Sequence, residues 1–261
     1  MEIITIINRR GGAGKTATAH ALGSGLLKRG FKVLFIDLDS QTNLTYDTGA
    51  TGSGFTSMDL LTRQATINQA IKQTPAGDIV PANQTLAGAD LILTETGKEY
   101  RLKEAIEEIS GKYDFIIIDT PPALGIITIN ALTASHAAII PAQAEIHSLQ
   151  GIGLLNETIN TIRKYTNKNL FIDGILLTRY NGRSIISKDM KENLEEIAKA
   201  LNTKVYSTPI RECVSVKEAQ AQQQSIFTYA PRSNAAKDYD LFIEEFLKTR
   251  KEAAENGKET I

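Results

Sequence analysis

Cysteine and histidine are scarce in this sequence of 261 residues, and their scarcity excludes several classes of site. Cys213 is the only cysteine, so one chain cannot form an internal disulfide framework or a cysteine-rich zinc or iron–sulfur centre. The three histidines, His20, His136 and His147, show no metal-ligand spacing. These absences predict a protein of a reducing, intracellular compartment.

Long apolar runs are also missing. No segment approaches about 18 uninterrupted apolar residues, so the sequence predicts no membrane span and no membrane partner. The apolar N-terminal segment, residues 1–7, is too short for the core of a secretory signal. The pair Arg9-Arg10 precedes glycines instead of the apolar stretch that twin-arginine export needs, so we expect a cytoplasmic protein.

The chain as a whole lacks an excess of either charge. It has 29 basic and 30 acidic residues, a net charge of −1 that by itself predicts no polyanion binding. The distribution is less even, because residues 160–217 hold eleven basic residues against six acidic ones. On charge alone, a solvated helix face is the favoured interpretation of this local excess, and a nucleic-acid surface is the alternative.

Short apolar runs alternate with helical patterns along the chain. The runs at residues 3–7, 33–36, 115–118, 137–140 and 171–177 are apolar on both faces, which is typical of buried parallel strands. Helical patterns occupy residues 16–29, 102–109, 126–134, 149–165 and 187–201. This order predicts an α/β fold with a doubly wound, mostly parallel sheet flanked by helices, in a single domain over residues 1–261.

Two further segments are less regular. Residues 42–84 are rich in Thr, Gly and Ser, and we expect an elaborated loop region with short helices at 57–61 and 67–72. The C-terminal segment predicts one helix at about residues 233–254, and the tail at 255–261 is expected to fray.

A glycine-rich segment lies between the first predicted strand and the first predicted helix. It reads Arg10-Gly11-Gly12-Ala13-Gly14-Lys15-Thr16-Ala17. Glycines let backbone N–H groups turn toward a phosphate, and the start of a helix adds positive potential. In this context Lys15 would contact the β- and γ-phosphates, and the Thr16 hydroxyl would bind Mg²⁺. The segment therefore predicts a nucleotide site, with an empty glycine-rich turn as the alternative.

The spacing of this segment and four other motifs resemble one family over the full length of the chain. Arg9 stands where the common P-loop pattern has its first glycine, a deviant Walker A form. The other motifs are Asp37-Leu38-Asp39-Ser40-Gln41, Ile118-Asp119-Thr120-Pro121-Pro122, Ile210-Arg211-Glu212 and Ala235-Ala236-Lys237-Asp238-Tyr239. Taken together, the sequence resembles the ParA/Soj-type partition ATPases.

The resemblance implies a P-loop ATPase with ATP and Mg²⁺ as cofactors. It also implies an ATP-sandwich homodimer, non-specific DNA binding, a nucleoid-associated location and a ParB-like centromere-binding partner that stimulates slow ATP hydrolysis. The cargo would be plasmid, chromosome or mobile-element DNA. Two positions depart from the family pattern: Arg10 replaces the extra lysine that reaches the partner's phosphates, and Ala17 replaces a threonine. Arg10 keeps the charge but changes its geometry.

Three carboxylates are candidates for the metal and the reaction. Asp119 ends an apolar strand, where a carboxylate can face Mg²⁺ through water, and a simple turn cap is the alternative. By resemblance, Asp39 orients or activates the attacking water and Asp37 lies nearer the metal. We therefore expect Lys15, Asp39 and Arg10 to be catalytic, and Thr16, Asp37 and Asp119 to form the metal site.

The resemblance also places the adenine pocket and the DNA surface. The base would lie between a turn that contains Thr178 and Arg179 and a loop formed by Pro209, Ile210 and Arg211. Thr178 as a plain strand end and Pro209 as a plain turn former remain alternatives. The candidate DNA-binding residues are Arg183, Arg211 and Lys217.

Two other functions share parts of this pattern. A MinD-like membrane-associated ATPase is the alternative function, but residues 248–260 lack the large apolar anchors and basic majority of a membrane-binding helix. An electron-transfer relative of the nitrogenase iron protein would need paired cysteines, which this chain lacks.

Overall fold

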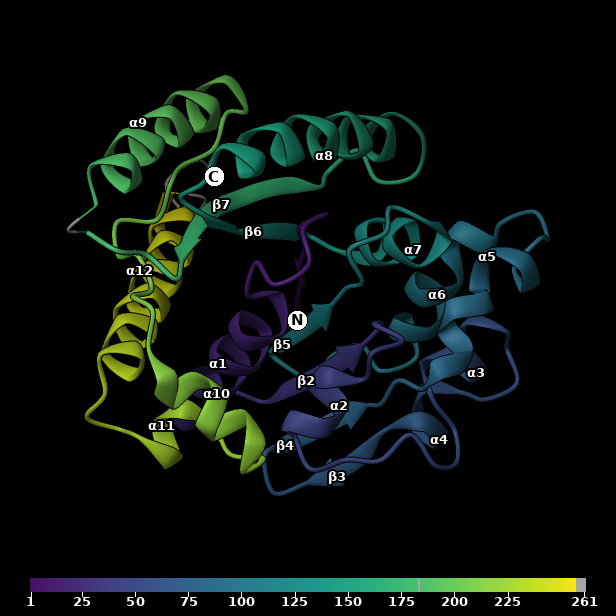
Figure 1. The fold of residues 1–261 in the computed structure, drawn as a ribbon. Helices are drawn as coiled ribbons and strands as arrows, with labels where there is room; N and C mark the ends of the chain where they lie inside the picture. The colour runs from purple at the N-terminus through teal and green to yellow at the C-terminus, as the bar shows by residue number, and fades with distance from the viewer. Residues whose placement is uncertain (183, 257–261) are drawn as a thin grey trace.

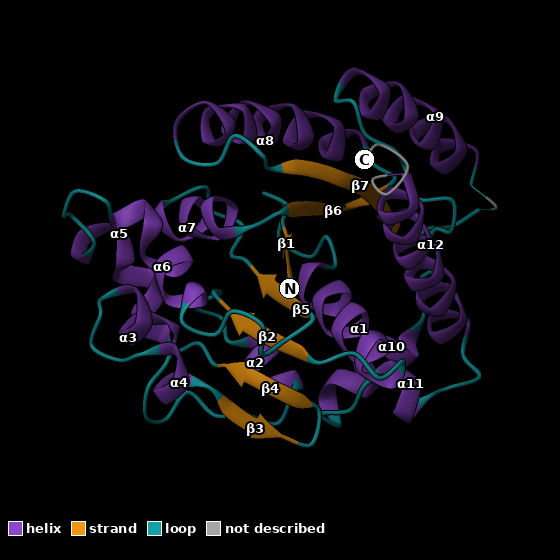
Figure 2. Cartoon of the chain, turned by 180° about the vertical axis from the view of Figure 1, so that it is seen from behind, coloured by secondary structure: helices purple, strands orange, loops and turns teal. Residues whose placement is uncertain are grey.

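A seven-stranded sheet forms the centre of the molecule in the computed structural model, which describes residues 1–182 and 184–256 (Figure 1). The strands are β1 (Glu2–Ile6), β2 (Val33–Asp37), β3 (Lys72–Thr74), β4 (Gly77–Val80), β5 (Phe115–Asp119), β6 (Ala137–Gln143) and β7 (Phe171–Thr178). Their order is β3-β4-β2-β5-β1-β6-β7, and Figure 2 shows it from β3 at one edge to β7 at the other. Arg183 and the tail at residues 257–261 lie outside the described residues.

Six of the seven strands are parallel. The central strand β1 pairs with β5 on one side and β6 on the other, and among the strands of residues 1–182 and 184–256 only the β3–β4 pair is antiparallel. The predicted fold class, a mostly parallel sheet flanked by helices, is confirmed. Because parallel strands end at the same edge, the segments after β1, β2, β5 and β7 meet there.

The region at residues 42–84 is more regular than the sequence indicated. It contains β3 and β4 as well as α2 (Asn43–Asp47), α3 (Ser57–Leu61) and α4 (Ile67–Ala70). The second expected helix ends at Ala70, because Lys72 already begins β3. β3 is a short polar edge strand, so it lacks the apolar run that reveals a buried strand.

Helices cover both faces of the sheet. The remaining helices are α1 (Lys15–Lys28), α5 (Ala89–Ile92), α6 (Arg101–Glu107), α7 (Ile126–Ala134), α8 (Ile146–Tyr165), α9 (Ile185–Ala200), α10 (Val214–Ala221), α11 (Ile226–Tyr229) and α12 (Asn234–Asn256), with 3-10 turns at Gln84–Gly88 and Lys98–Tyr100. The helices α1, α10, α11 and α12 pack on one face. The helices α3 to α9 pack on the other face in two neighbouring clusters.

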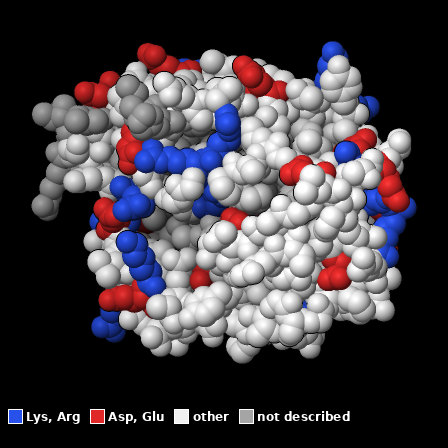
Figure 3. Space-filling view, turned by 45° about the vertical axis from the view of Figure 1, so that its right-hand side comes forward, with Lys and Arg blue, Asp and Glu red and all other residues white. Residues whose placement is uncertain are grey.

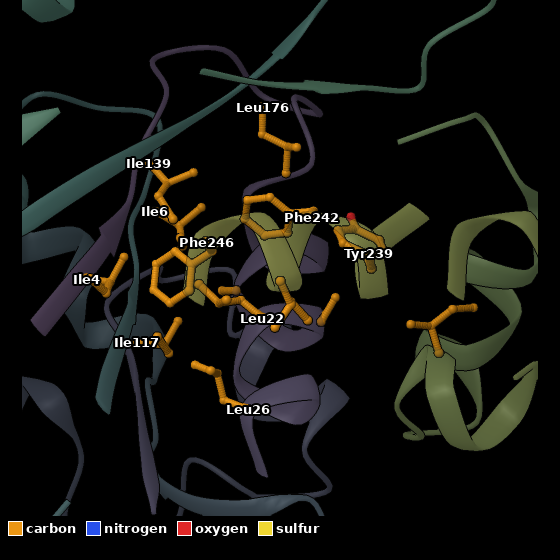
Figure 4. Close-up of a cluster of buried hydrophobic side chains, with 14 of the residues drawn as sticks. Ile4, Ile6, Leu22, Leu26, Ile117, Ile139, Leu176, Tyr239, Phe242 and Phe246 are labelled. Carbon is orange, nitrogen blue, oxygen red and sulfur yellow. The ribbon is translucent and has the colours of Figure 1, made fainter. Parts of the chain in front are cut away.

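The core beneath α12 connects the end of the chain to its beginning. Phe242 and Phe246 of α12 are fully buried against Leu22 of α1 and against Ile4 and Ile6 of β1 (Figure 4). Burying a side chain of this size contributes roughly 1.5–3 kcal/mol. The C-terminal helix is therefore fixed relative to α1, and α1 begins directly after Gly14 of the glycine-rich segment.

Candidate nucleotide-binding site

The glycine-rich segment forms a loop between β1 and α1. Gly12 has φ 76° and Gly14 has φ 87°, in the left-handed region that favours glycine. A Cβ on Gly14 would also meet the Thr178 side chain at 3.4 Å. Both glycines are therefore needed for the path of the loop, which agrees with a loop that turns backbone N–H groups toward an anion.

Three side chains hold this loop, two of them from distant segments and one from the residues just before it. Gln143, at the end of β6, donates from Nε2 to the Gly12 carbonyl at 2.8 Å. The Thr178 hydroxyl, at the end of β7, donates to the Ala13 carbonyl at 2.8 Å. Asn8 accepts from the Arg10 backbone N–H at 2.9 Å and donates to a β6 carbonyl at 2.6 Å. The loop is thus fixed to three neighbouring strand ends before any ligand binds.

Lys15 begins α1 and lies inside the loop. Its side chain is only 7% exposed, and its Nζ donates to the Arg10 carbonyl at 3.2 Å. Burial lowers the pKa of Lys15, and the charges of Asp119 and Asp39 oppose that shift. A partly desolvated ammonium of this kind interacts strongly with phosphate, because electrostatic interactions strengthen where the effective dielectric is low.

Thr16 and Asp119 form the candidate metal site. The Thr16 hydroxyl donates to Asp119 Oδ2 at 2.6 Å, while Asp119 Oδ1 is buried and has no hydrogen-bond partner among the described residues. Burial and the neighbouring charge of Asp37, its partner across β2 and β5, raise the pKa of Asp119 well above the usual value. A buried carboxylate oxygen without a partner, beside a hydroxyl, fits Mg²⁺ and its bound waters. The residues present therefore suit this ion.

Asp37 is held differently from Asp119. Its Oδ2 accepts from the Thr45 backbone N–H at 2.8 Å and from the Thr45 hydroxyl at 2.7 Å. Its Oδ1 accepts from the Asp39 backbone N–H at 3.0 Å. Burial raises the pKa of Asp37 to about 6, although these hydrogen bonds favour the ionised form. Asp37 therefore shapes the turn after β2 as well as adding negative charge beside Asp119.

Asp39 lies two residues further along this turn. It is largely buried, lines the cleft, and accepts from the Gln41 backbone N–H at 3.0 Å through Oδ1. The same cleft is lined by Lys15 and Thr16. The structure thus brings the predicted catalytic carboxylate to the side of the phosphate loop, where a carboxylate can orient water.

The cleft has a volume of about 520 Å³, ample for a nucleotide. Beyond the phosphate loop it is lined by Thr178, Arg179, Ile210 and Arg211, as expected for the base, whereas Pro209 is not among its lining residues. The two walls are joined, because the Tyr180 N–H donates to the Ile210 carbonyl at 2.9 Å. Arg179 also forms an ion pair with Glu212 at 2.7 Å across the opening.

The three predicted DNA-binding residues differ in their surroundings. Arg211 is engaged by Asp238 at 2.6 Å, Lys217 lines the cleft on α10, and Arg183 lies outside the described residues. Ion pairs of Lys191 with Glu195 and of Lys204 with Glu245 further reduce the local basic excess. Figure 3 shows basic and acidic side chains beside one another on one part of the surface.

Arg10, the residue that replaces the family's extra lysine, has a partner within its own chain. Its NH1 lies 2.5 Å from Glu145 Oε2, and both side chains are partly exposed. Glu145 immediately precedes α8. A contact between Arg10 and a second subunit would therefore replace or extend this pair.

Several residues at the site carried no signal in the sequence. Asn8 and Gln143 act through hydrogen bonds to segments that are distant in the chain, and Thr45 through bonds to Asp37, eight residues before it; polar residues at such positions are too common to single out. Gln220 of α10 and Tyr239 of α12 line the cleft only because their helices pack on α1. Of these residues, Asn8 could have been predicted most readily, because it lies between the first predicted strand and the glycine-rich segment.

Comparison with known proteins agrees with this geometry. A family model described as an AAA domain matches residues 1–172. The sporulation initiation inhibitor protein Soj of Bacillus subtilis is 39% identical over 98% of this chain and 99% of its own length. The chromosome-partitioning ATPase Soj of Treponema pallidum is 33% identical over 94% and 97%, respectively. The chain belongs to the ParA/Soj family of partition ATPases.

Solved structures of proteins similar to this ParA/Soj family member have the same fold. A cobyrinic acid a,c-diamide synthase from Mycobacterium smegmatis, with bound ATP analogue and magnesium, has a TM-score of 0.83 at 31% identity and covers 96% of each chain. A putative plasmid partition protein from Borrelia burgdorferi, bound to AMPPNP, has a TM-score of 0.79 at 27% identity and covers 95% and 99%. The relatives thus bind ATP analogues, one of them with magnesium, and the expected cofactors, ATP and Mg²⁺, are confirmed.

The sequence-based identification of the ParA/Soj family is confirmed, and an ATPase with a role in partition is the function that the family supports. Within residues 1–182 and 184–256, none of the helices combines the length and the apolar character that a membrane crossing requires. The roles of individual residues stay predictions, although most of them lie together at the cleft.

Proposed function

We propose that this protein is an ATP-dependent partition ATPase that forms an ATP-sandwich dimer, binds DNA without sequence preference and hydrolyses ATP slowly until a ParB-like partner stimulates it. The cargo would be plasmid, chromosome or mobile-element DNA, and the protein would be associated with the nucleoid. The single observation that carries the ATPase part is the convergence of Lys15, Thr16, Asp39 and Asp119 at one cleft.

The geometry supports a distinct task for each residue at the phosphate end of the cleft. Lys15 would hold the terminal phosphates, because its ammonium is buried beside the loop that carries the backbone donors. Thr16 and Asp119 would hold Mg²⁺, which neutralises phosphate charge when bound. Asp39 would orient the attacking water, since its carboxylate lines the cleft and its Oδ1 is fixed by the turn at Gln41.

The dimer part of the proposal rests on Arg10. Its side chain leaves the phosphate loop itself and is partly exposed, so a second subunit could approach it. An activity that needs two chains is slow when the chains are separate, which explains a low basal rate. A partner protein that stabilises the closed dimer would then raise it.

The DNA part of the proposal rests on the basic excess at residues 160–217 and on the family. A dimer doubles every basic surface, and affinity for DNA without sequence preference comes from neutralised phosphates. DNA binding should therefore require ATP and fall steeply with salt. The partly paired cations favour a modest number of phosphate contacts by each subunit.

The partition names come from relatives that are more similar to this chain than the synthase is. The Soj proteins are 33–39% identical over at least 94% of this chain, against 31% for the synthase. We therefore propose the partition activity and not the cobyrinic acid a,c-diamide synthase activity for which that relative is named. We also propose that the whole chain acts as one ATPase domain.

The experiment is to follow ATP hydrolysis and binding to a random DNA duplex with ATP, with ADP and without nucleotide, from low to high salt. We expect slow hydrolysis, DNA binding only with ATP, and a log–log salt slope of about −0.9 for each phosphate contacted. The Lys15→Gln variant serves as the control that cannot hold the phosphates. DNA binding that is independent of ATP, or that does not change with salt, would contradict the proposed DNA binding. The absence of ATP hydrolysis with any partner protein would contradict the whole proposed function.

A further inference from the structure

The strongest unassigned feature of the molecule is a buried carboxylate behind the cleft. Asp238, on α12, is only 4% exposed and does not line the cleft itself. Its carboxylate accepts three hydrogen bonds, all from Arg211: from the backbone N–H at 3.0 Å, from Nε at 2.8 Å and from NH2 at 2.6 Å. Both carboxylate oxygens are used, so this residue fixes the main chain and the side chain of Arg211 together.

Arg211 belongs to the wall of the cleft that is expected to face the base. On the side away from Asp238, this wall is joined to the end of β7, because the Ile210 N–H donates to the Leu177 carbonyl at 2.7 Å and the Tyr180 N–H to the Ile210 carbonyl at 2.9 Å. Thr178 in turn bonds to the phosphate loop. These hydrogen bonds connect the phosphate loop through β7 to Ile210, and the bonds of Asp238 to Arg211 fix the wall on its other side.

The helix that carries Asp238 is itself rigidly placed. Tyr239, the next residue, lines the cleft, and Phe242 and Phe246 are fully buried against α1 and the sheet (Figure 4). Because α1 begins at the phosphate loop, α12 can set the distance between that loop and the wall at Arg211. A wall that is fixed in advance lowers the ordering cost when a ligand binds.

We propose that Asp238 is a positioning residue for the nucleotide base: through Arg211 it fixes the wall at Ile210–Arg211 at the distance from the phosphate loop that a nucleoside triphosphate spans. This inference rests on the proposed ATPase function. It assigns Arg211 mainly to the cleft and only secondarily to DNA, since the buried carboxylate already engages its guanidinium.

The matched test compares two substitutions on the same helix. Asp238→Asn keeps the shape but removes the charge that holds Arg211. Asp240→Asn removes the ion pair of Arg29 with Asp240, measured at 2.8 Å, which joins α12 to α1 away from the cleft. Each variant is titrated with Mg-ATP and, separately, with inorganic triphosphate and Mg²⁺, which fills the phosphate loop but has no base.

The expected result is selective. Asp238→Asn should weaken ATP binding about three- to tenfold through the lost preorganisation, with triphosphate binding unchanged. The maximal rate at saturating ATP should stay within about twofold, since the phosphate end is untouched. Asp240→Asn should change neither affinity.

Three outcomes would overturn the inference: equal effects of the two substitutions, a parallel loss of ATP and triphosphate binding in Asp238→Asn, or unchanged ATP binding in Asp238→Asn. Retained triphosphate binding also shows that the variant is folded. The wild-type protein separates this inference from the proposed function. If the wild type neither hydrolyses ATP nor prefers it to triphosphate, the proposed function fails; if it does both and Asp238→Asn matches it, only the positioning role fails.

Discussion

The Thr16 hydroxyl donates a 2.6 Å hydrogen bond to Asp119 Oδ2, although the two residues are 103 positions apart in the chain. Thr16 lies in the first turn of α1, the helix after β1, and Asp119 ends β5, which is the strand beside β1. Adjacent parallel strands therefore bring the hydroxyl and the carboxylate to the same edge of the sheet. Within the part of the chain that the structure describes, the second oxygen of Asp119 has no hydrogen-bond partner, which is why we assign the pair to Mg²⁺.

Replacement of Thr16 tests this assignment. Thr16→Ala removes the hydroxyl and should weaken the dependence of ATP binding on Mg²⁺ together with hydrolysis, by about tenfold or more for a lost ligand in a buried site. Thr16→Ser keeps the hydroxyl and should retain most activity. The measurement is ATP affinity over a magnesium titration, and equal magnesium dependence in the Ala and Ser variants would contradict the assignment.

Asp39 is the predicted catalytic carboxylate. Asp39→Ala should still bind ATP and dimerise, because the phosphate loop does not depend on this side chain, but it should not hydrolyse ATP. Orientation of a water by a carboxylate contributes about 10²- to 10⁴-fold. Single-turnover hydrolysis and sedimentation with ATP measure the two properties. Hydrolysis by Asp39→Ala at the parental rate would show that another residue orients the water.

The parts of the site that the sequence predicted are those that depend on local pattern. The loop from Gly11 to Thr16 follows a strand and opens a helix, and Asp119 ends an apolar run, so neighbouring residues alone locate both. The bonds from Gln143 to Gly12 and from Asp238 to Arg211 depend on how distant segments pack, and no local pattern encodes them.

In the fold, too, the strands with a clear local pattern were predicted and those without one were not. The five strands that contain the apolar runs are mostly buried and were predicted within two or three residues at each end. The edge strand β3 was missed because Lys72, Gln73 and Thr74 bury no continuous apolar face. The strand β4 was missed as well; Gly77, which begins it with φ 121°, pairs with Thr74 of β3.

Asp47 makes stability depend on pH. Burial beneath α10 raises the pKa of Asp47 to about 6 from 3.8, and Gln220 donates to its carboxylate at 2.7 Å. The folded protein therefore binds this proton more tightly than the unfolded chain, so the contribution to stability is lost as the pH rises from about 4 through 6. A gap of about two pKa units corresponds to about 3 kcal/mol.

Asp47→Asn should consequently be more stable than the wild type at pH 7 and lose that advantage near pH 4, as measured by urea unfolding across this range. Gln220→Ala removes a hydrogen bond that favours the ionised carboxylate, so it should raise the pKa of Asp47 further and steepen the loss of stability. A constant difference between Asp47→Asn and the wild type from pH 4 to 7 would contradict the prediction.

Arg250 joins the C-terminal helix to the sheet. It forms two 2.7 Å hydrogen bonds to Glu2 and approaches the buried Asp173 at 3.4 Å, and its side chain is 16% exposed. Arg250→Ala leaves a buried carboxylate without its cation and should lower the free energy of unfolding by about 3 kcal/mol. The control is Lys248→Ala, which breaks the ion pair of Lys248 with Glu252 on the same helix. Because the Lys248 side chain is 77% exposed, this variant should change the free energy of unfolding by under about 0.5 kcal/mol. Similar midpoints in urea for both variants would contradict a structural role for Arg250.

The 2.5 Å ion pair with Glu145 competes with any contact that Arg10 makes across a dimer interface. If Arg10 contacts the partner's phosphates, Arg10→Ala should leave ATP affinity within a few-fold but weaken ATP-dependent dimerisation and DNA binding together. Arg10→Lys keeps the charge, so retained dimerisation would show that charge suffices, and its loss would show that the guanidinium geometry is needed.

Glu145→Gln separates the two partners of Arg10. Removal of the carboxylate frees the guanidinium without changing it, so the ATP-dependent dimer should become more stable, most clearly at low salt, where ionic interactions between exposed groups are least screened. Sedimentation of all four proteins with a non-hydrolysable ATP analogue measures this. Identical monomer–dimer profiles for the wild type and Arg10→Ala would mean that Arg10 serves only the pair with Glu145, because a phosphate contact across a desolvated interface contributes well above the 1 kcal/mol or so of a surface ion pair.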